Sequence, residues 1–140
     1  MSDLRERREA VVREHMASEN DLDFDRTIAT FAHPRYELMA TGAVFDGEDA
    51  VRGYFASSRR AFPDQHNEDT VLHHMDDGVL AEFDLVGTHT GAFAGFEPTG
   101  RSFRTRMAAL FIFEDGGAGI VCERVYFDQA SILHQLGLVT

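Results

Sequence analysis

GVLAEFDLVGTHTGAFAGFEPTGRSFRTRMAALFIF, residues 78–113, is the stretch that decides the fold of this chain. Apolar and polar residues alternate over 78–90 and again over 102–114, which is the period of two that predicts β-strands. The segment 87–101, which spans their connection, contains four glycines and one proline, residues that favour turns. The pattern predicts two long antiparallel strands joined by a glycine-rich hairpin connection.

The connection also contains a near match to a phosphate-binding loop, from Gly95 to Ser102. Such a loop needs a lysine where this chain has Arg101, and all thirteen basic residues of the chain are arginines. It also needs a helix directly after the glycines, whereas 102–107 alternates as a strand. The stretch is therefore predicted to be a hairpin and not a nucleotide site. The missing lysine also excludes Schiff-base chemistry.

Apolar residues at helical spacing predict four helices. These are 3–18, a short helix that begins near its cap Asp21 and ends before Pro34, 48–61, and 129–136 with Asp128 as its cap. We expect the second helix to bury Leu22, Ile28 and Phe31.

Strands are expected in two short pieces within 35–46, and over 66–76 and 119–127, in addition to the two long ones. Helices followed by an antiparallel meander and a closing helix predict an α+β fold with helices on one face of a curved sheet.

Composition and charge narrow the class of protein. The chain of 140 residues is expected to form a single domain, 1–140. A net charge of −11 argues against nucleic-acid binding, and no apolar run approaches the roughly 20 residues that span a membrane. Cys122 has no partner for a disulfide, and the charged start has no signal-peptide core. We expect a cytoplasmic protein.

The GTHTG and PTGR motifs of the hairpin, followed by a strand, resemble those of the SnoaL-like polyketide cyclase (ester cyclase) family. Phe45-Asp-Gly47, Phe62-Pro-Asp64 and the tail from Asp128 to Gly137 extend the resemblance over roughly 5–138. The resemblance implies the nuclear-transport-factor-2-like cone fold, in which a bent sheet surrounds an apolar pocket. It also implies closure of a polyketide ring by aldol chemistry without cofactor or metal.

The chain departs from the residues that this resemblance would place in the site. Where the family has its acid/base aspartate, on the last strand, this chain has Val125, and where the family has a pocket histidine it has Glu123. The polar pair of the preceding strand corresponds to Met107 and Ala109, and an asparagine of the first strand to Leu38. The scaffold is kept while the known catalytic set is largely replaced.

Glu123 is the best candidate for a general acid or base. Strand alternation places it on one face with Val121, Val125 and Phe127. If that face lines the interior, burial disfavours the charged form of the carboxylate and suits it to proton transfer. Alternatively, Glu123 lies at an edge or is paired with an arginine.

His89 is the second catalytic candidate, because it lies near the end of its strand on the inward face. It would shuttle a proton or hold a substrate oxygen, or else only bind the backbone of the hairpin. The expected substrate-binding residues are Tyr36, Tyr54, Phe83, Met107, Phe111, Val125 and Phe127. His73 and His74 point to opposite faces, so they are not a metal pair, and the sequence has no HxxxH spacing and no cysteine cluster; we therefore expect no metal site. The resemblance implies that there is no cofactor.

On the convex face we expect Arg104, Arg106 and Arg124 to form a homodimer contact. Two functions remain open. One is a cofactor-independent enzyme that acts on a hydrophobic small molecule by aldol cyclisation, isomerisation, dehydration or hydrolysis. The other is a non-catalytic pocket protein that binds a hydrophobic metabolite, which the apolar residues at 107, 109 and 125 favour.

Overall fold

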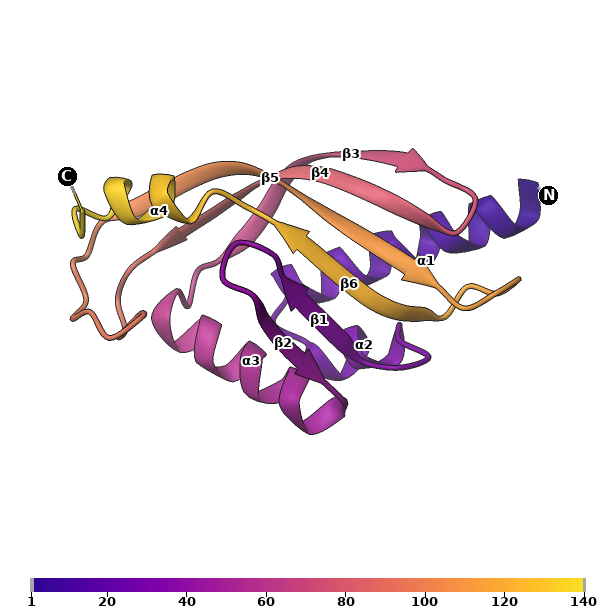
Figure 1. Cartoon of the computed structure of the whole chain (residues 1–140), viewed down its shortest axis with the longest axis horizontal. Coiled ribbons are helices and arrows are strands. Elements are labelled where there is room, and N and C mark those ends of the chain that lie inside the picture. The colour runs from indigo at the N-terminus through magenta and orange to yellow at the C-terminus, as the bar shows by residue number, and fades with distance from the viewer. Residues whose placement is uncertain (1, 140) are drawn as a thin grey trace.

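The computed structural model describes residues 2–139, which form four helices and one six-stranded sheet (Figure 1). The helices are α1 (Ser2–Asn20), α2 (Phe24–Ala29), α3 (Glu48–Ala61) and α4 (Gln129–Gln135). The strands are β1 (Arg35–Leu38), β2 (Ala43–Asp46), β3 (His66–His74), β4 (Gly78–Thr88), β5 (Ser102–Phe113) and β6 (Ile120–Tyr126). The expected α+β class is confirmed. None of the described helices is long and apolar enough to cross a membrane.

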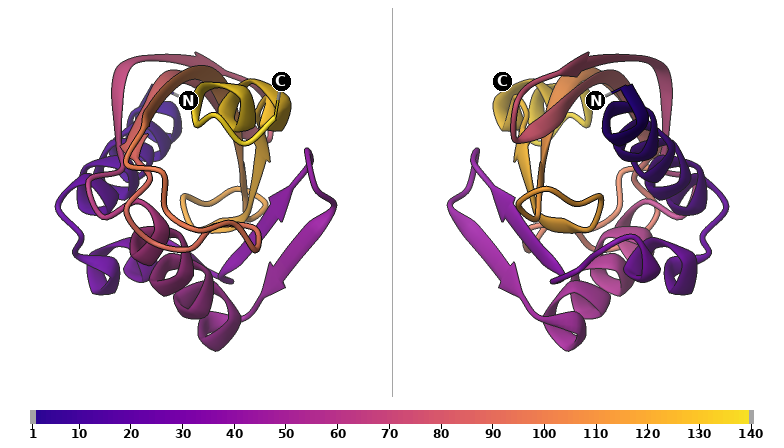
Figure 2. Two further views of the ribbon diagram at one scale, coloured as in Figure 1. Left: turned by 90° about the vertical axis from the view of Figure 1, so that its left-hand side faces the viewer. Right: turned by 90° about the vertical axis from the view of Figure 1, so that its right-hand side faces the viewer.

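The sheet has the order β2-β1-β6-β5-β4-β3. All neighbouring pairs are antiparallel except β1 and β6, which are parallel. Seen along the long axis, the strands curve around an interior whose other side is closed by α1, α2 and α3 (Figure 2). The hairpin connection after β4 and the helix α4 lie at one end of the molecule. The sheet and the helices thus surround the core of the protein.

Strand register aligns the inner side chains into rows across the sheet. Tyr36 is opposite Glu123, Glu123 is opposite Phe111, and Phe111 is opposite Val79. All four side chains are buried. Burial of each large apolar side chain contributes about 1.5–3 kcal/mol, so this row is a main source of stability. It also carries one carboxylate, that of Glu123, into the core.

A β-bulge in β6 corrects one sequence expectation. Ile112 is opposite Cys122 while Phe113 is opposite Ile120, so Val121 is the extra residue of the bulge. Ile120, not Val121, is therefore the inward residue, and it is fully buried in the core. Past the bulge, Glu123 and Val125 point inward as alternation predicts.

The start of α2 differs from the expectation. Asp23 is its N-cap and accepts a hydrogen bond from the backbone N–H of Arg26 at 3.3 Å. Asp21 instead pairs with the guanidinium of Arg26. Leu22 lies in the turn with φ +58°, which directs its side chain outward, and it is 49% exposed rather than buried.

The arginines of the convex face have partners within the chain. Arg104 pairs with Asp84 and Glu68, Arg106 pairs with Asp84, and Arg124 pairs with Glu37. Each of these arginines therefore already has an acidic partner within the chain.

The capping of α2 gives a test of this part of the fold. We expect Asp23→Ala to lower the free energy of unfolding by about 1 kcal/mol, since it leaves a helix N–H without its acceptor. Asp21→Ala should cost less, because exposed ion pairs contribute about 0–1 kcal/mol. Urea unfolding of the two variants measures both values. A larger loss for Asp21→Ala would contradict the assignment of the cap.

Candidate functional site

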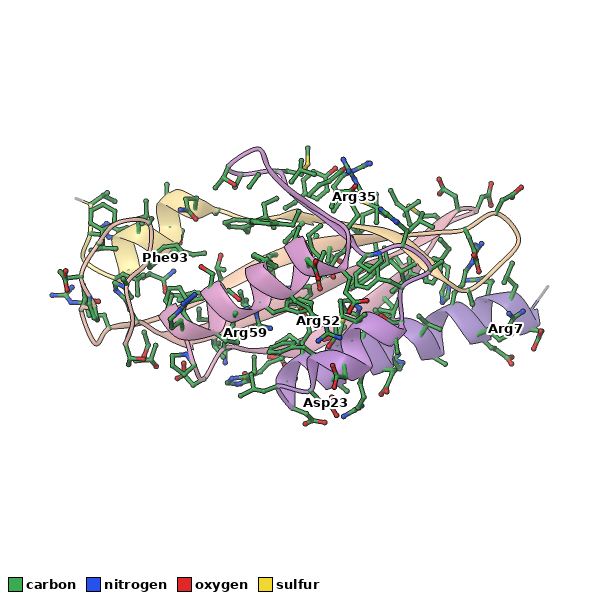
Figure 3. All side chains as sticks on the ribbon, turned by 90° about the horizontal axis from the view of Figure 1, so that it is seen from below. Arg7, Asp23, Arg35, Arg52, Arg59 and Phe93 are labelled. Atoms are coloured by element: carbon green, nitrogen blue, oxygen red, sulfur yellow. The ribbon has the colours of Figure 1, made fainter. Side chains whose placement is uncertain are left out.

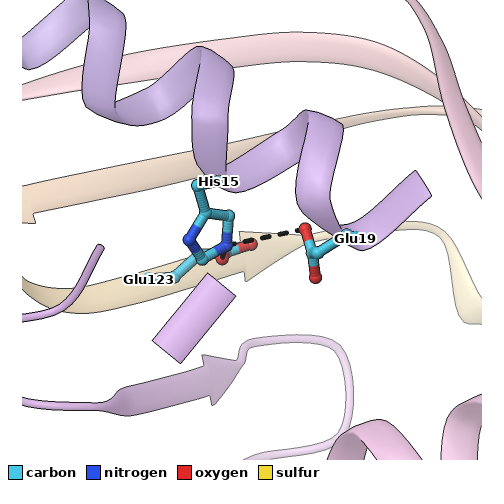
Figure 4. A group of neighbouring side chains, drawn as sticks. All are labelled: His15, Glu19 and Glu123. Atoms are coloured by element: carbon cyan, nitrogen blue, oxygen red, sulfur yellow. Dashed lines mark ion pairs between the residues drawn. The ribbon is translucent and has the colours of Figure 1, made fainter. Parts of the chain in front are cut away.

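A buried group of ionisable side chains lies between α1 and the sheet. His15 and Glu19 come from one face of α1, and Glu123 comes from the inner face of β6 (Figure 4). The Nε2 atom of His15 is 2.7 Å from Oε1 of Glu123 and 3.5 Å from Oε1 of Glu19. The His15 side chain is fully buried and that of Glu123 is 7% exposed. A histidine and two carboxylates thus share one site in the core.

Hydrogen bonds on the far side of the imidazole assign its protons. Nδ1 of His15 lies 2.9 Å from the hydroxyl oxygen of Thr30. That hydroxyl donates its single hydrogen to the carbonyl oxygen of Thr27 at 2.6 Å, so it can only accept from His15. Nδ1 therefore carries a proton. The nitrogen that can gain or lose a proton is Nε2, which faces the carboxylates.

Two more side chains complete the group. The hydroxyl of Tyr36 lies 3.0 Å from Nε2 of His15 and donates to Oε2 of Glu19 at 3.2 Å. The guanidinium of Arg59, from α3, lies 3.6 Å from the same Glu19 oxygen. We call His15, Glu19, Tyr36, Arg59 and Glu123 the polar cluster. Its members come from α1, β1, α3 and β6, so the packing of the whole chain sets its geometry.

Burial and charge shift the proton affinities within the polar cluster. Burial lowers the pKa of His15, but the carboxylates of Glu123 and Glu19 outweigh it, and the pKa is raised above its usual value. Burial raises the pKa of Glu19, and burial holds the pKa of Tyr36 well above its ordinary range. These groups therefore retain protons that they would lose in water at the same pH.

The polar cluster borders two small cavities in the interior. A polar cavity of about 50 Å³ is lined by Glu123, Tyr36, Glu19 and Arg59, by apolar residues, and by further polar side chains, namely Asn20, Gln65, His66 and Asn67. An apolar cavity of about 150 Å³ lies toward α4 and the hairpin connection. Both cavities are lined by Tyr54, Gln65, Leu85, Met107 and Val125. The two therefore meet at a common wall, which the sequence had not indicated.

The structure places all seven expected substrate-binding residues on these walls. Tyr36, Phe83 and Phe111 line the polar cavity, and Phe127 lines the apolar one. The other three, Tyr54, Met107 and Val125, line both. Glu123 also lines the polar cavity, and it is paired with a histidine rather than with an arginine or an apolar surround.

His89 does not lie on the wall of either cavity. Its ring packs against Phe62 and Phe93, and its Nδ1 accepts a hydrogen bond from the backbone N–H of Thr99 at 3.2 Å. In the neutral ring the proton is then on Nε2, which is buried without a partner among the described residues. The structure thus brings His89 to the hairpin and separates it from Glu123. These contacts favour the structural alternative for this residue.

His15, Glu19 and Arg59 were not among the residues expected at the site. One signal was present in the sequence, because His15 and Glu19 are four residues apart and lie beside Val12 and Met16 on the apolar side of the first helix. An ionisable residue on such a face needs a buried partner. Sequence spacing alone does not say that the partner is Glu123.

His15, Glu19 and Glu123 are also residue types that bind metal ions. One donor atom each from His15, Glu19 and Glu123 lies within 4.8 Å of the others. However, the 2.7 Å between His15 and Glu123 is a hydrogen-bond distance, and Glu19 already faces a tyrosine hydroxyl and a guanidinium. A nearby cation disfavours a second cation on the same carboxylate. The arrangement fits an ion pair between His15 and Glu123 better than a metal ion.

Many solved structures are similar to this fold, including the following three. One is a candidate polyketide cyclase from Xanthomonas campestris pv. campestris, with 20% identity, a TM-score of 0.85, and coverage of 94% of this chain and 98% of that chain. Another is a phenazine biosynthesis-related protein from Pseudomonas aeruginosa, with 20% identity, a TM-score of 0.83, and coverage of 99% and 86%.

The third is a hypothetical protein with a ketosteroid isomerase-like fold from Catenulispora acidiphila, in complex with trimethylamine. It has 24% identity, a TM-score of 0.77, and coverage of 92% of this chain and 93% of that chain. At these identities the likeness concerns the fold alone.

A comparison with curated proteins gives no match. The model of the family described as SnoaL-like polyketide cyclase matches residues 9–136, which is nearly the whole chain. The resemblance carried by the hairpin and tail motifs is therefore confirmed, and the chain belongs to the SnoaL-like polyketide cyclase family.

Proposed function

We propose that this protein is a cofactor-independent enzyme that moves a proton at a carbon next to a carbonyl group, with Glu123 as general base and acid. The observation that carries the proposal is a buried carboxylate that lines a cavity and has an imidazole 2.7 Å behind it. Aldol cyclisation and isomerisation both begin with this step. The family to which the chain belongs supports that class of reaction.

In the proposed step the Glu123 carboxylate takes the proton from carbon, and the electron pair of the C–H bond moves onto the carbonyl oxygen as an enolate. The proton then returns to another carbon in an isomerisation. In an aldol closure the enolate carbon forms a bond to a second carbonyl carbon, and Glu123 returns its proton to the new alkoxide. Either sequence leaves Glu123 as it began, so no cofactor is consumed.

The side chains around Glu123 have distinct roles in this proposal. His15 does not line the cavity, so it acts as a positioning residue that holds the Glu123 carboxylate in place through their contact at 2.7 Å. Tyr54 lines both cavities, and burial raises the pKa of its hydroxyl. It therefore stays protonated and can donate to the developing enolate oxygen.

The position of Glu123 also accounts for the loss of the aspartate that the family has at position 125. Residues 123 and 125 point to the same side of β6, and both line the polar cavity. A carboxylate two residues earlier therefore still faces the interior. The alternative, a pocket protein that binds a hydrophobic metabolite without turnover, is supported by the apolar residues Met107 and Ala109.

A proton-exchange experiment separates these two functions. We expect the wild-type protein to accelerate deuterium uptake next to the carbonyl of cyclohexanone in D₂O, followed by NMR. Glu123→Gln should lower the rate by about 100-fold or more, because a neutral amide cannot take the proton. Glu82→Gln, which changes a carboxylate paired with His73 on the outer face, should leave it unchanged. A wild-type rate equal to that of buffer would support the pocket protein.

The charge of His15 offers a second test. We expect its pKa in the wild type to lie above the ordinary value of about 6.5. In Glu123→Gln the pKa should fall, since the attraction of the Glu123 carboxylate no longer offsets the effect of burial. Because the folded pKa is raised, the stabilisation by the pair is present at low pH and is lost as the pH rises through that pKa. Histidine NMR titration measures it; an unchanged pKa in the variant would show that Glu123 does not hold the charge.

We also propose that two copies of the chain associate through the convex face of the sheet. Leu80 and Leu110 are neighbours on that face and are only half-buried in the single chain. Tyr126, on the same face, is 44% exposed. These side chains would supply the apolar part of the contact, since the arginines are already paired within the chain.

Light scattering tests the association. A dimer should give twice the chain mass of 15.7 kDa. Leu110→Glu places a charge in the proposed contact and should shift the mass to that of a single chain. Glu97→Gln, in the exposed hairpin connection, is the control. A wild type with the mass of one chain would contradict the proposal.

A further inference from the structure

Arg59 is a buried guanidinium with unused hydrogen-bond donors. It lies on α3 (Figure 3). It lines the polar cavity, and its side chain is 10% exposed. Nη1 donates to the hydroxyl of Ser58 at 2.8 Å, but Nε is buried and has no partner among the described residues. Nη2 is 3.6 Å from Glu19, too far for a good hydrogen bond. A buried donor without an acceptor is rare in folded proteins and indicates a missing partner.

The charges around the polar cavity favour a negative partner. Arg59 is a permanent cation, and the carboxylates beside His15 raise the pKa of its imidazole, which favours the positive form. Burial raises the pKa of Glu19, which reduces the negative charge that this carboxyl group offers to Arg59. The guanidinium lies 3.6 Å from Glu19 and has an unpartnered Nε, so its charge is incompletely compensated in a buried setting. An anion that enters the cavity would compensate it.

The neighbouring apolar cavity limits the size of an apolar group attached to such an anion. Aromatic and aliphatic residues make most of its wall, among them Phe62, Phe93, Phe103, Phe127 and Ile132. Its volume of about 150 Å³ is that of cavities known to bind a single benzene ring. A fused system of three or four rings would not fit without movement of these walls.

The residues shared by the two cavities place the site for an anionic group beside the site for a small apolar group. Gln65 and Tyr54 line both cavities, so the cavity that Arg59 lines adjoins the apolar one at these two side chains. Polar side chains at this boundary can hold an oxygen atom between the two parts of one ligand. A molecule with an anionic end and a single ring would occupy both cavities at once.

We propose that the ligand is a carboxylic acid with a single ring, whose carboxylate binds the guanidinium of Arg59 and whose ring fills the apolar cavity. Planar guanidinium and carboxylate groups match in paired hydrogen bonds. The proposal rests on the proposed function in one respect, namely that this cavity is where Glu123 reacts. It adds the class of substrate, which the family does not specify for this chain.

Binding to the wild-type protein tests the proposal first. The probes are phenylacetate and its neutral counterpart phenylacetamide, which have the same ring and nearly the same shape. Isothermal titration at pH 6.5 should show phenylacetate binding at least tenfold more tightly. Equal affinities, or tighter binding of the amide, would overturn the proposal without any variant.

Substitution of Arg59 then locates the site. Arg59→Gln should remove the tenfold preference, while Arg60→Gln, which changes the next and exposed arginine of α3, should keep it. Arg59→Lys keeps the charge but loses the paired geometry, so the preference should fall to an intermediate value. Thermal melts identify a variant that does not fold, in which case Arg59→Lys decides. A preference that is unchanged in the folded Arg59 variants would overturn the assignment.

The same proteins distinguish this inference from the proposed function. Glu123→Gln should keep the preference for phenylacetate, because it leaves Arg59 in place, while it loses deuterium exchange. Exchange activity without a preference for the carboxylate would overturn only the substrate class. A preference without exchange activity would support the carboxylate site and contradict the proposed enzyme.

Discussion

The pair between Glu123 and His15 is the interaction on which the rest of the interior depends. A carboxylate on the inner row of the sheet would be strongly disfavoured alone, because burial removes its solvation. It is tolerated because α1 brings an imidazole to 2.7 Å. Removal of one member of a buried pair typically costs about 3–5 kcal/mol, since the other charge is left uncompensated. The packing of α1 against the sheet and the geometry of the site therefore depend on the same pair of side chains.

That constraint extends from His15 into the helical layer. The ring is oriented by Thr30, at the end of α2, whose hydroxyl is in turn fixed by the carbonyl of Thr27. Ser18 and Thr27 share a further hydrogen bond, which joins α1 to α2. The helices that close the cone thus also determine which imidazole nitrogen faces the carboxylate. The orientation of the imidazole that faces Glu123 is therefore set by residues that do not line the cavities.

Most elements could be predicted from the sequence because each depends on local signals. Alternation located the long strands, and the end of α3 follows from Pro63. The bulge at Val121 could not be predicted, because alternation reports a period and not an inserted residue. Likewise, Glu123 was recognised as inward from its own strand. Its partner His15 is 108 positions away in sequence, and only the packing of α1 across the sheet brings them together.

The distribution of polarity inside the cone constrains where chemistry can occur. The inner row of β5 supplies Met107, Ala109 and Phe111, so this strand offers no polar group to the cavities. The ionisable groups that line the polar cavity come instead from α1, β1, α3, β3 and β6. A molecule bound across the two cavities would therefore meet polar side chains in one of them and mostly apolar side chains in the other. In the proposed reaction its reacting carbon would lie beside Glu123, and its apolar part would extend toward α4, where the apolar cavity lies.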